Sequence, residues 1–307
     1  MDEDWRLAGK ARTLKVRASM IRSIRRFFED RDFLECETPL RIPAPAPETH
    51  IDAVASGDWF LQTSPELCMK RLLAAGYPKL FQICKCFRAG ERGDFHLPEF
   101  TMLEWYRAGT DYYALMEDCE SLMTHVAGEL GLGDTVRWQG RRICLSPPWE
   151  RMTVRDAFAR YAGISVDEAL QDDCFDQTMV CRIEPHLGME RPVFLYEYPA
   201  ELGALARVSA VTPGVAERFE LYAAGVELAN AFSELTDAAE QRRRFEKAIL
   251  DRRIRKGPAT PLPERFLDAL SGMPPSAGIA LGVDRLAMIL TDRAAIGDVV
   301  AFTPESL

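Results

Sequence analysis

The sequence has 307 residues, of which 47% are hydrophobic and 28% charged, enough for one large core or two modest domains. It contains no run of about 18 apolar residues, which argues against a membrane span. Its acidic start lacks the apolar region of a signal peptide, so we expect a cytoplasmic protein. The net charge of −9 and the lack of a long basic run weigh against extended binding to nucleic acid, without excluding it.

Eight cysteines are scattered along the chain and form no C-x-x-C pair, so the strongest zinc signature is lacking. Most lie in apolar runs, where free cysteine usually behaves as a small buried hydrophobe. We therefore expect buried free thiols rather than metal ligands, including at Cys84 and Cys86, which share one face of a predicted strand.

Helical and extended patterns alternate over the first part of the chain. Apolar side chains at spacings of three and four predict a helix over 14–30, with Thr13 as its N-cap. An extended stretch over 33–39 and a proline-rich loop over 40–50 follow. A second helix is predicted over 65–75, where a proline suits the first turn.

Two strands are predicted over 80–88 and 99–107, around a polar loop, which indicates a hairpin with a functional loop. A helix over 111–130 follows. The pattern over 152–180 is also helical but less regular, and it is typical of a small insertion over the core. Residues 192–199 predict a strand that ends at a proline.

The last third of the chain predicts a second hairpin over 217–235, a charged helix over 237–256, and a glycine-edged strand running into a helix over 278–291. Strands that come mostly as hairpins, with helices grouped between them, indicate an α+β fold with an antiparallel sheet flanked by helices. Neither G-x-G-x-x-G nor G-x-x-x-x-G-K-[ST] occurs, so a nucleotide would be held by other means.

The first hairpin gathers polar side chains. Because side chains alternate along a strand, Phe100, Glu104 and Tyr106 share one face, and Arg88 ends the opposing strand. The loop adds His96. The same alternation occurs in any half-buried sheet with a polar loop, so alone it fits function and ordinary structure about equally.

The second hairpin carries Glu220 and Glu227 on its two arms. Opposed carboxylates repel each other unless a cation lies between them, and Mg²⁺ prefers one or two carboxylates plus substrate phosphates. Asn230 and Glu234 extend this polar cluster. The alternative is a pair of exposed glutamates at a sheet edge.

The glycines of segment 278–285 would let a ligand approach the backbone closely. Arg285, at the start of the following helix, would then direct its guanidinium at a phosphate or an aromatic base. The alternative is an ordinary strand-to-helix junction with a solvated Arg285.

Together these regions resemble the signature motifs of class II aminoacyl-tRNA synthetases over nearly the whole chain. Motif 1 is similar to the helix that leads to ECETP at 35–39, motif 2 to CFR and PEFTMLEWY on either side of the first hairpin loop, and motif 3 to GVDR at 282–285. Residues 217–235 are similar to the lysyl branch in particular.

The resemblance implies a role for each matching residue. Arg88 corresponds to the arginine that holds the amino-acid carboxylate and the α-phosphate, Phe100 to the aromatic that stacks on adenine, and Arg285 to the arginine on its far side. Arg88 and Arg285 are thus the implied catalytic residues. The implied ligands of ATP are Arg88, His96, Phe100, Glu220, Glu227 and Arg285. The implied ligands of Mg²⁺ are Glu220 and Glu227. The implied amino-acid pocket comprises Ser64, Glu66, Glu104, Tyr106, Asn230, Phe232, Glu234 and Ala280.

Departures from the lysyl pattern point to a subfamily. Lysyl-tRNA synthetases carry an N-terminal anticodon-binding domain, whereas here we expect a single catalytic domain over 1–307, with 152–180 as its insertion. Ser64 and Ala280 stand where those enzymes usually have alanine and glycine, as in the elongation factor P β-lysine ligases. These truncated paralogues use β-lysine, with a lysine of elongation factor P as acceptor and no tRNA.

Motif 2 also departs from the family, because the usual Arg-Asn-Glu reads Arg88, Ala89, Gly90. A glutamate contact to the adenine edge is therefore in doubt, although Glu91 would replace it if the loop shifts.

The resemblance predicts an AMP-forming ligase that uses ATP and Mg²⁺ to join lysine or β-lysine to elongation factor P. Two alternatives remain: a lysyl-adenylate ligase with another acceptor, and a catalytically silent paralogue that serves as a binding subunit. Class II cores usually dimerise through motif 1, so we expect a homodimer through residues 14–39. The apolar stripe of that segment would equally fit burial in the protein's own core.

Overall fold

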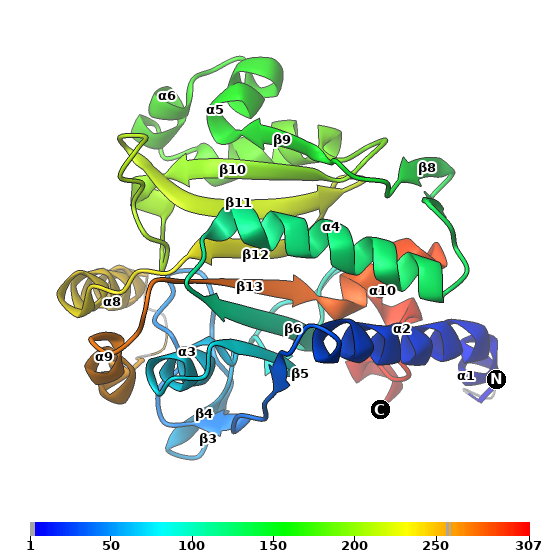
Figure 1. Cartoon of the computed structure of the whole chain (residues 1–307), viewed down its shortest axis with the longest axis horizontal. Helices are drawn as coiled ribbons and strands as arrows, with labels where there is room; N and C mark the ends of the chain where they lie inside the picture. Colours follow the sequence, from blue (N-terminus) through cyan, green and yellow to red (C-terminus); the bar gives the residue numbers. More distant parts are fainter. Residues whose placement is uncertain (1–3, 256–257, 259) are drawn as a thin grey trace.

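The computed structural model describes residues 4–255, 258 and 260–307. Its main strands are β1 (Leu34–Glu35), β5 (Lys79–Phe87), β6 (Glu99–Ala108), β9 (Glu150–Thr153), β10 (Val193–Pro199), β11 (Val215–Ala223), β12 (Val226–Ser233) and β13 (Ser276–Gly282). They form one sheet in the order β1-β5-β6-β13-β12-β11-β10-β9 (Figure 1). Short strands β2 (Arg41–Ile42), β3 (Ala55–Ser56), β4 (Trp59–Leu61), β7 (Thr135–Trp138) and β8 (Arg141–Cys144) form two smaller sheets.

The predicted antiparallel sheet is confirmed in its centre, where β5, β6, β13, β12, β11 and β10 pair antiparallel. The two outer pairs, β1 with β5 and β9 with β10, are parallel. Parallel neighbours need long crossover connections, and both pairs have them. The β9–β10 crossover is the helical segment that includes residues 154–180.

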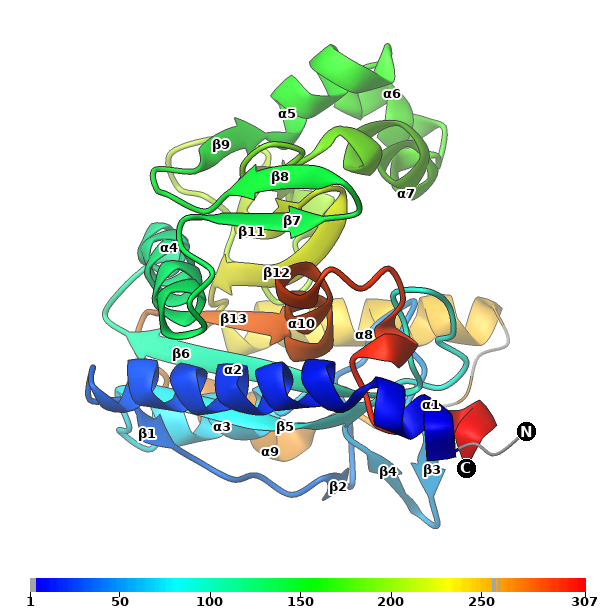
Figure 2. The same ribbon diagram turned by 90° about the vertical axis from the view of Figure 1, so that its right-hand side faces the viewer.

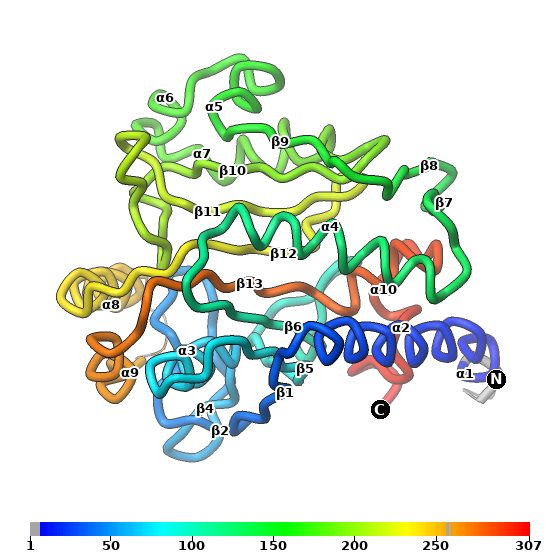
Figure 3. Tube along the Cα trace, in the orientation of Figure 1, coloured from blue at the N-terminus to red at the C-terminus, as the bar shows by residue number. Residues whose placement is uncertain are grey.

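The helices are α1 (Asp4–Gly9), α2 (Ala11–Glu29), α3 (Glu66–Ala74), α4 (Tyr112–Glu129), α5 (Val154–Ala157), α6 (Val166–Gln171), α7 (Phe175–Thr178), α8 (Ala238–Ile254), α9 (Glu264–Leu270) and α10 (Val283–Thr291). Within the described residues, none has both the length and the apolar character that crossing a membrane requires. Helix α1 lies beside the C-terminal segment (Figure 3), where Lys10 Nζ donates to the Gly297 carbonyl at 2.8 Å.

Most predicted elements are confirmed within a few residues, and several local predictions are wrong. Lys10, not Thr13, is the N-cap of α2, and the buried Thr13 hydroxyl accepts a hydrogen bond from Arg293 Nε at 3.2 Å. Segment 40–50 contains β2 in addition to loop, and the first two residues of the helical pattern predicted over 152–180 belong to β9. Helix α9 lies in a stretch for which no element was predicted. Of the helix predicted over 237–256, Lys256 lies outside the described residues.

All eight cysteines lie in the described part of the chain and are free thiols. Cys86 and Cys119 are buried as predicted. The prediction of burial is wrong at Cys181, which is exposed on a helical turn at the surface. It holds only in part at the five half-buried cysteines, which are Cys36, Cys68, Cys84, Cys144 and Cys174.

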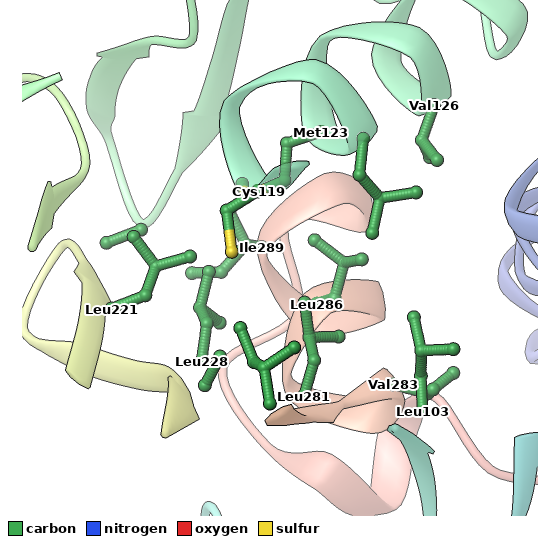
Figure 4. Close-up of a cluster of buried hydrophobic side chains, with 14 of the residues drawn as sticks. Leu103, Cys119, Met123, Val126, Leu221, Leu228, Leu281, Val283, Leu286 and Ile289 are labelled. Atoms are coloured by element: carbon green, nitrogen blue, oxygen red, sulfur yellow. The ribbon is translucent and has the colours of Figure 1, made fainter. Parts of the chain in front are cut away.

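Helices α2, α4 and α10 cover one face of the sheet. The largest hydrophobic cluster lies between these helices and the sheet. Figure 4 shows Leu103, Leu221 and Leu281 of the sheet in one cluster with Met123 of α4 and with Leu286 and Ile289 of α10. The apolar stripe of α2 faces this core, since Phe28 is fully buried and stacks on Phe81 at 4.8 Å. The homodimer through residues 14–39 therefore stays a prediction, which the mass of the protein in solution would test.

Helices α3, α8 and α9 pack on the opposite face at one end of the sheet, around a separate cluster that includes Leu80, Tyr106 and Phe245. Figure 2 shows α4 and α8 on opposite sides of the sheet. The middle of this second face carries polar side chains, and the candidate site lies there.

Residues 154–180 form short helices, whose hydrophobic cluster lies over the β9–β10 end of the sheet (Figure 3). This cluster includes Tyr198 and Tyr222, whose hydroxyls reach the candidate site. The segment therefore supports one wall of the site from outside.

A β-bulge shapes the second hairpin. Leu221 pairs with Ala229, but Tyr222 pairs with Glu227, so Leu228 is an extra residue on β12. An inserted residue reverses the alternation of side chains beyond it. Glu227 and Asn230, three residues apart, are therefore both half-buried on the same face.

We predict that Gly188 holds the turn of this hairpin in place. A Cβ at Gly188 would lie 2.5 Å from the carbonyl oxygen of Tyr222, and its φ is +68°. Gly163 has a similar φ of +73°, but a Cβ there would meet nothing within 4 Å. We expect Gly163→Ala to lower the free energy of unfolding by about 1–2 kcal/mol and Gly188→Ala by about 1–3 kcal/mol more. Equal losses in chemical denaturation would contradict this role.

Candidate active site

The register of four central strands brings distant residues into one row. Glu104 on β6 pairs with Ala280 on β13, Ala280 with Asn230 on β12, and Asn230 with Glu220 on β11. Sheet alternation puts this row on the face opposite α2, α4 and α10. Four of the residues expected at the site thus lie side by side.

The Glu104 carboxylate is held by two hydroxyl donors. Ser64 Oγ donates to Oε1 at 2.6 Å, and Tyr106 OH donates to Oε2 at 2.7 Å. Ser64 Oγ also accepts from the Glu66 backbone N–H at 2.9 Å. Burial, reinforced by the nearby Glu66, raises the pKa of Glu104 to about 7. The predicted pocket residues Ser64, Glu66, Glu104 and Tyr106 therefore belong to one hydrogen-bonded group.

A buried lysine joins two further carboxylates of this pocket. Lys70 Nζ lies 2.5 Å from Glu66 Oε1 and also forms an ion pair with Glu234 Oε2. It lies 4.9 Å from the ring centre of Phe232. Lys70 was not among the predicted site residues, although its i,i+4 spacing from Glu66 on one helix is visible in the sequence.

Glu234 has an acceptor that no side chain or backbone group of the described residues satisfies. The side chain is fully buried, and Oε1 accepts no hydrogen bond from any of these residues. Burial and the nearby Glu66 outweigh the attraction of Lys70 and raise the pKa of Glu234 to about 8. A buried acceptor without a donor is rare and costly, so a ligand cation would stabilise this position.

The backbone of Gly278 lies directly beneath two side chains of this pocket. A Cβ at Gly278 would lie 2.2 Å from Tyr106 Cε1 and 2.4 Å from Glu234 Oε1. Both side chains therefore lie directly over the Gly278 backbone, which only glycine permits at this distance. The sequence indicated that a ligand would approach these glycines; at Gly278 it is protein side chains that do so.

The Glu220 carboxylate is surrounded by protein donors. Arg218 Nη2 donates to Oε1 at 2.5 Å, and the hydroxyls of Tyr198 and Tyr222 each donate to Oε2 at 2.6 Å. Arg218 Nε also donates to Asn230 Oδ1 at 3.2 Å. Arg218 and both tyrosines were missed in the sequence, although Arg218 lies two residues from Glu220 and so shares its strand face.

Arg285 joins the second hairpin to the loop of the first. Its Nη1 donates to the Glu227 carbonyl at 2.8 Å and to Glu227 Oε2 at 3.2 Å. Its Nη2 donates to His96 Nε2 at 2.7 Å. Burial and the Arg285 charge lower the pKa of His96, which keeps the imidazole neutral and able to accept this bond. Arg285, Glu227 and His96 are thus brought together as predicted.

Arg88 lies over the Phe100 ring, with its guanidinium carbon 5.1 Å from the ring centre. Its Nη1 is 3.7 Å from Glu91 Oε1. Glu91 therefore faces Arg88, and its contact with the adenine edge stays a prediction. Glu48, from the segment predicted as loop, also faces Arg88, and burial raises its pKa to about 7. It had no signal in the sequence beyond its charge.

The carboxylates of the second hairpin fit a divalent cation by their chemistry. Burial raises the pKa of Glu220, and Glu227 raises it further. Burial and the same two glutamates raise the pKa of Glu184 to about 7. Mutual repulsion of this kind is relieved by a cation with oxygen ligands. No three acidic, cysteine or histidine side chains in the described ranges already converge closely enough to hold a metal ion.

A buried ion pair lies behind Phe100 and Arg285. Asp284 Oδ1 lies 2.5 Å from Arg17 Nη1 of α2, and Asp284 Oδ2 accepts from the Thr101 N–H at 2.7 Å. Arg17 Nη2 also donates to Thr101 Oγ1 at 3.0 Å. Because Thr101 follows Phe100 and Asp284 precedes Arg285, this network holds both predicted adenine-binding residues from behind.

Comparison with known proteins gives consistent matches. The family model of class II tRNA synthetases (D, K and N) matches residues 4–306. A protein of Edwardsiella ictaluri named elongation factor P–(R)-β-lysine ligase is 41% identical over 316 residues, which cover 97% of each chain. Proteins of the same name from Salmonella arizonae and Erwinia tasmaniensis are each 40% identical over 316 residues, again covering 97% of each chain.

The pKa values of the buried carboxyls predict how stability depends on pH. The pKa of Glu234 is raised from 4.5 to about 8, so the folded chain binds more protons than the unfolded chain between these values. The ligand-free protein should therefore lose stability as pH rises through this range, by up to about 1.4 kcal/mol per pH unit for each such group. We expect Glu234→Gln to flatten the loss of unfolding free energy between about pH 6 and 8.

The exposed Glu129→Gln variant is the matched control, because it removes one carboxylate that is 46% exposed. It should leave the slope unchanged. The same slope in wild type and Glu234→Gln would show that this carboxyl titrates in its ordinary range.

Proposed function

This chain belongs to the family of class II tRNA synthetases (D, K and N), and from that premise we propose that it is an ATP-dependent ligase for lysine or (R)-β-lysine. The amino acid is activated as an adenylate and transferred to a lysine of elongation factor P, the reaction that the name of its relatives describes. The proposed acceptor is thus a protein and not tRNA.

The charge of the buried pocket carries this proposal. Three carboxylates, from Glu66, Glu104 and Glu234, surround one ammonium, from Lys70, which leaves a formal charge of −2 when all are ionised. An excess of buried negative charge is unfavourable and raises carboxyl pKa values. A diamino acid supplies two ammonium groups, which is the charge that the pocket lacks.

We assign the two ends of the substrate as the family pattern suggests. Glu104, Tyr106 and Glu234 hold the terminal ammonium, and Glu66 holds the amine nearer the carboxylate. The unpaired Glu234 Oε1 supports the first assignment, because a buried ammonium needs several acceptors. Asn230 and Phe232 form further walls of the pocket.

ATP is assigned to the same face of the sheet, next to the amino-acid pocket. Its adenine lies between Phe100 and Arg285, and Arg88 holds the α-phosphate and the amino-acid carboxylate. His96 of the loop faces the phosphate tail. The contact of Arg285 with His96 at 2.7 Å supports this group, since both residues are already gathered on one side.

Mg²⁺ is assigned to Glu220 and Glu227. When bound, it neutralises phosphate charge that would otherwise repel the attacking carboxylate. Glu227 would exchange its contact with Arg285 for the cation, which frees the guanidinium for the nucleotide. Glu220 keeps the tyrosine hydroxyls that orient it.

The first step requires placement and charge neutralisation more than a general base. A carboxylate oxygen of the amino acid attacks the α-phosphorus, and pyrophosphate leaves with the electrons of the broken P–O bond. The neutral amine of the acceptor lysine then attacks the carbonyl carbon, AMP leaves, and the nitrogen loses a proton.

We predict that purified protein catalyses ATP–pyrophosphate exchange with (R)-β-lysine and, upon addition of elongation factor P, transfers the amino acid to it. L-α-lysine and tRNA are compared in parallel. Exchange without transfer would retain the activation chemistry and point to another acceptor. The absence of exchange with either lysine isomer would favour a silent binding paralogue.

A second prediction concerns the choice between the two lysine isomers. Ala280 pairs with both Glu104 and Asn230, and Ser64 donates to Glu104 at 2.6 Å. Ser64 Oγ also accepts from the backbone N–H of Glu66 at 2.9 Å, and Glu66 is assigned to the amine whose position differs between the isomers. Ser64 therefore acts through the orientation of both glutamates. We expect the Ser64→Ala, Ala280→Gly double variant to shift the ratio of kcat/KM values towards L-α-lysine by about tenfold or more. An unchanged ratio would count against this role.

A further inference from the structure

Lys70 is a buried cation for which the proposed reaction has no direct use. It is 2% exposed, although lysine is rarely buried without a partner. Its ammonium is shared between Glu66 of its own helix and Glu234 after β12, and it faces the Phe232 ring. The charged groups around this cluster are Glu66, Glu104 and Glu234, together with the neutral phenol of Tyr106.

In both Glu66 and Glu234, Lys70 contacts only one of the two carboxylate oxygens. Lys70 engages Oε1 of Glu66 and Oε2 of Glu234. The second oxygen of Glu234 lies over Gly278 and beside Tyr106, on the pocket side. One ammonium therefore binds one oxygen of each of the two carboxylates that we assign to the substrate amines, which leaves the other oxygen of each for the substrate.

We propose that Lys70 is a positioning residue, which fixes the spacing of Glu66 and Glu234 so that the pocket binds diamino acids. This inference rests on the proposed function for the identity of the substrate. The contacts of Lys70 with the two carboxylates do not depend on it.

The attraction of two carboxylates outweighs the effect of burial on the pKa of Lys70. Burial alone would lower the pKa of Lys70, but Glu234 and Glu66 raise it, so the ammonium stays charged. In return Lys70 lowers the pKa of Glu234, which burial and Glu66 have raised. Without Lys70, the pKa of Glu234 would rise further, and the carboxyl would attract a substrate cation less strongly.

The test compares wild type with Lys70→Met, which keeps an unbranched side chain of nearly the same length and removes the charge. An opposite charge within about 4–6 Å lowers a carboxyl pKa by about 1–3 units, so removing it should raise KM for the lysine isomer about tenfold or more at neutral pH. KM for ATP should stay within about twofold of wild type. The rising limb of kcat/KM against pH should move to higher pH by about 1–3 units. Unchanged KM and pH profile would overturn the proposal.

Lys70→Arg separates charge from position. It keeps the cation, but its planar head differs from a compact ammonium. We expect the pH profile to stay near that of wild type while KM for the lysine isomer rises; an unchanged KM would overturn the positioning role. The matched control is Lys247→Met on α8, whose side chain is 79% exposed and pairs with Asp251 at its own i,i+4 spacing.

A readout without substrate keeps this proposal distinct from the proposed function. The carboxyl carbon of Glu234 is titrated by NMR in wild type and in Lys70→Met. If wild type fails to activate any lysine, the ligase proposal fails, but a rise of the Glu234 pKa in the variant would still support the role of Lys70. If Lys70→Met does not fold, the same titration is made with Lys70→Arg, where an unchanged pKa is expected and a raised one would overturn the proposal.

Discussion

Antiparallel pairing of β6, β13, β12 and β11 is the constraint on which the site depends, because it alone places Glu104, Ala280, Asn230 and Glu220 in one row. A slip of one residue would turn each of these side chains towards the core. The register is held by the other face, where Leu103 and Leu281 pack against α4 and α10. The apolar face of the sheet thus determines the geometry of the polar one.

Two acidic clusters on this face follow the same electrostatic rule. Each contains a cation, the buried Lys70 in one and the partly buried Arg218 in the other. In each, at least one tyrosine hydroxyl donates to a carboxylate. These partners make burial tolerable without cancelling the negative charge. The ligands that we propose, a diamino acid and Mg²⁺, carry the positive charge that would neutralise these two clusters.

Much of this arrangement was predictable from local patterns. Strand alternation placed Phe100, Glu104 and Tyr106 on one face, and turn residues placed the second hairpin. Lys70 was missed because its partner Glu234 is remote in sequence and lies close only after the sheet has formed. The bulge at Leu228 was missed because one extra apolar residue does not disturb a hydrophobic pattern enough to be seen. Thr13 looked like a cap because helix starts are the least certain part of such predictions.

The bridge from Arg17 to Asp284 and Thr101 has a thermodynamic consequence. It makes α2, on the far side of the sheet, part of the support of Phe100 and Arg285. Coupling free energy between two sites is reciprocal. Whatever alters the seating of α2, a neighbouring molecule included, would change the affinity for the nucleotide. By the same free energy, a bound nucleotide would strengthen or weaken that contact, so the seating of α2 and the binding of the nucleotide would be thermodynamically linked.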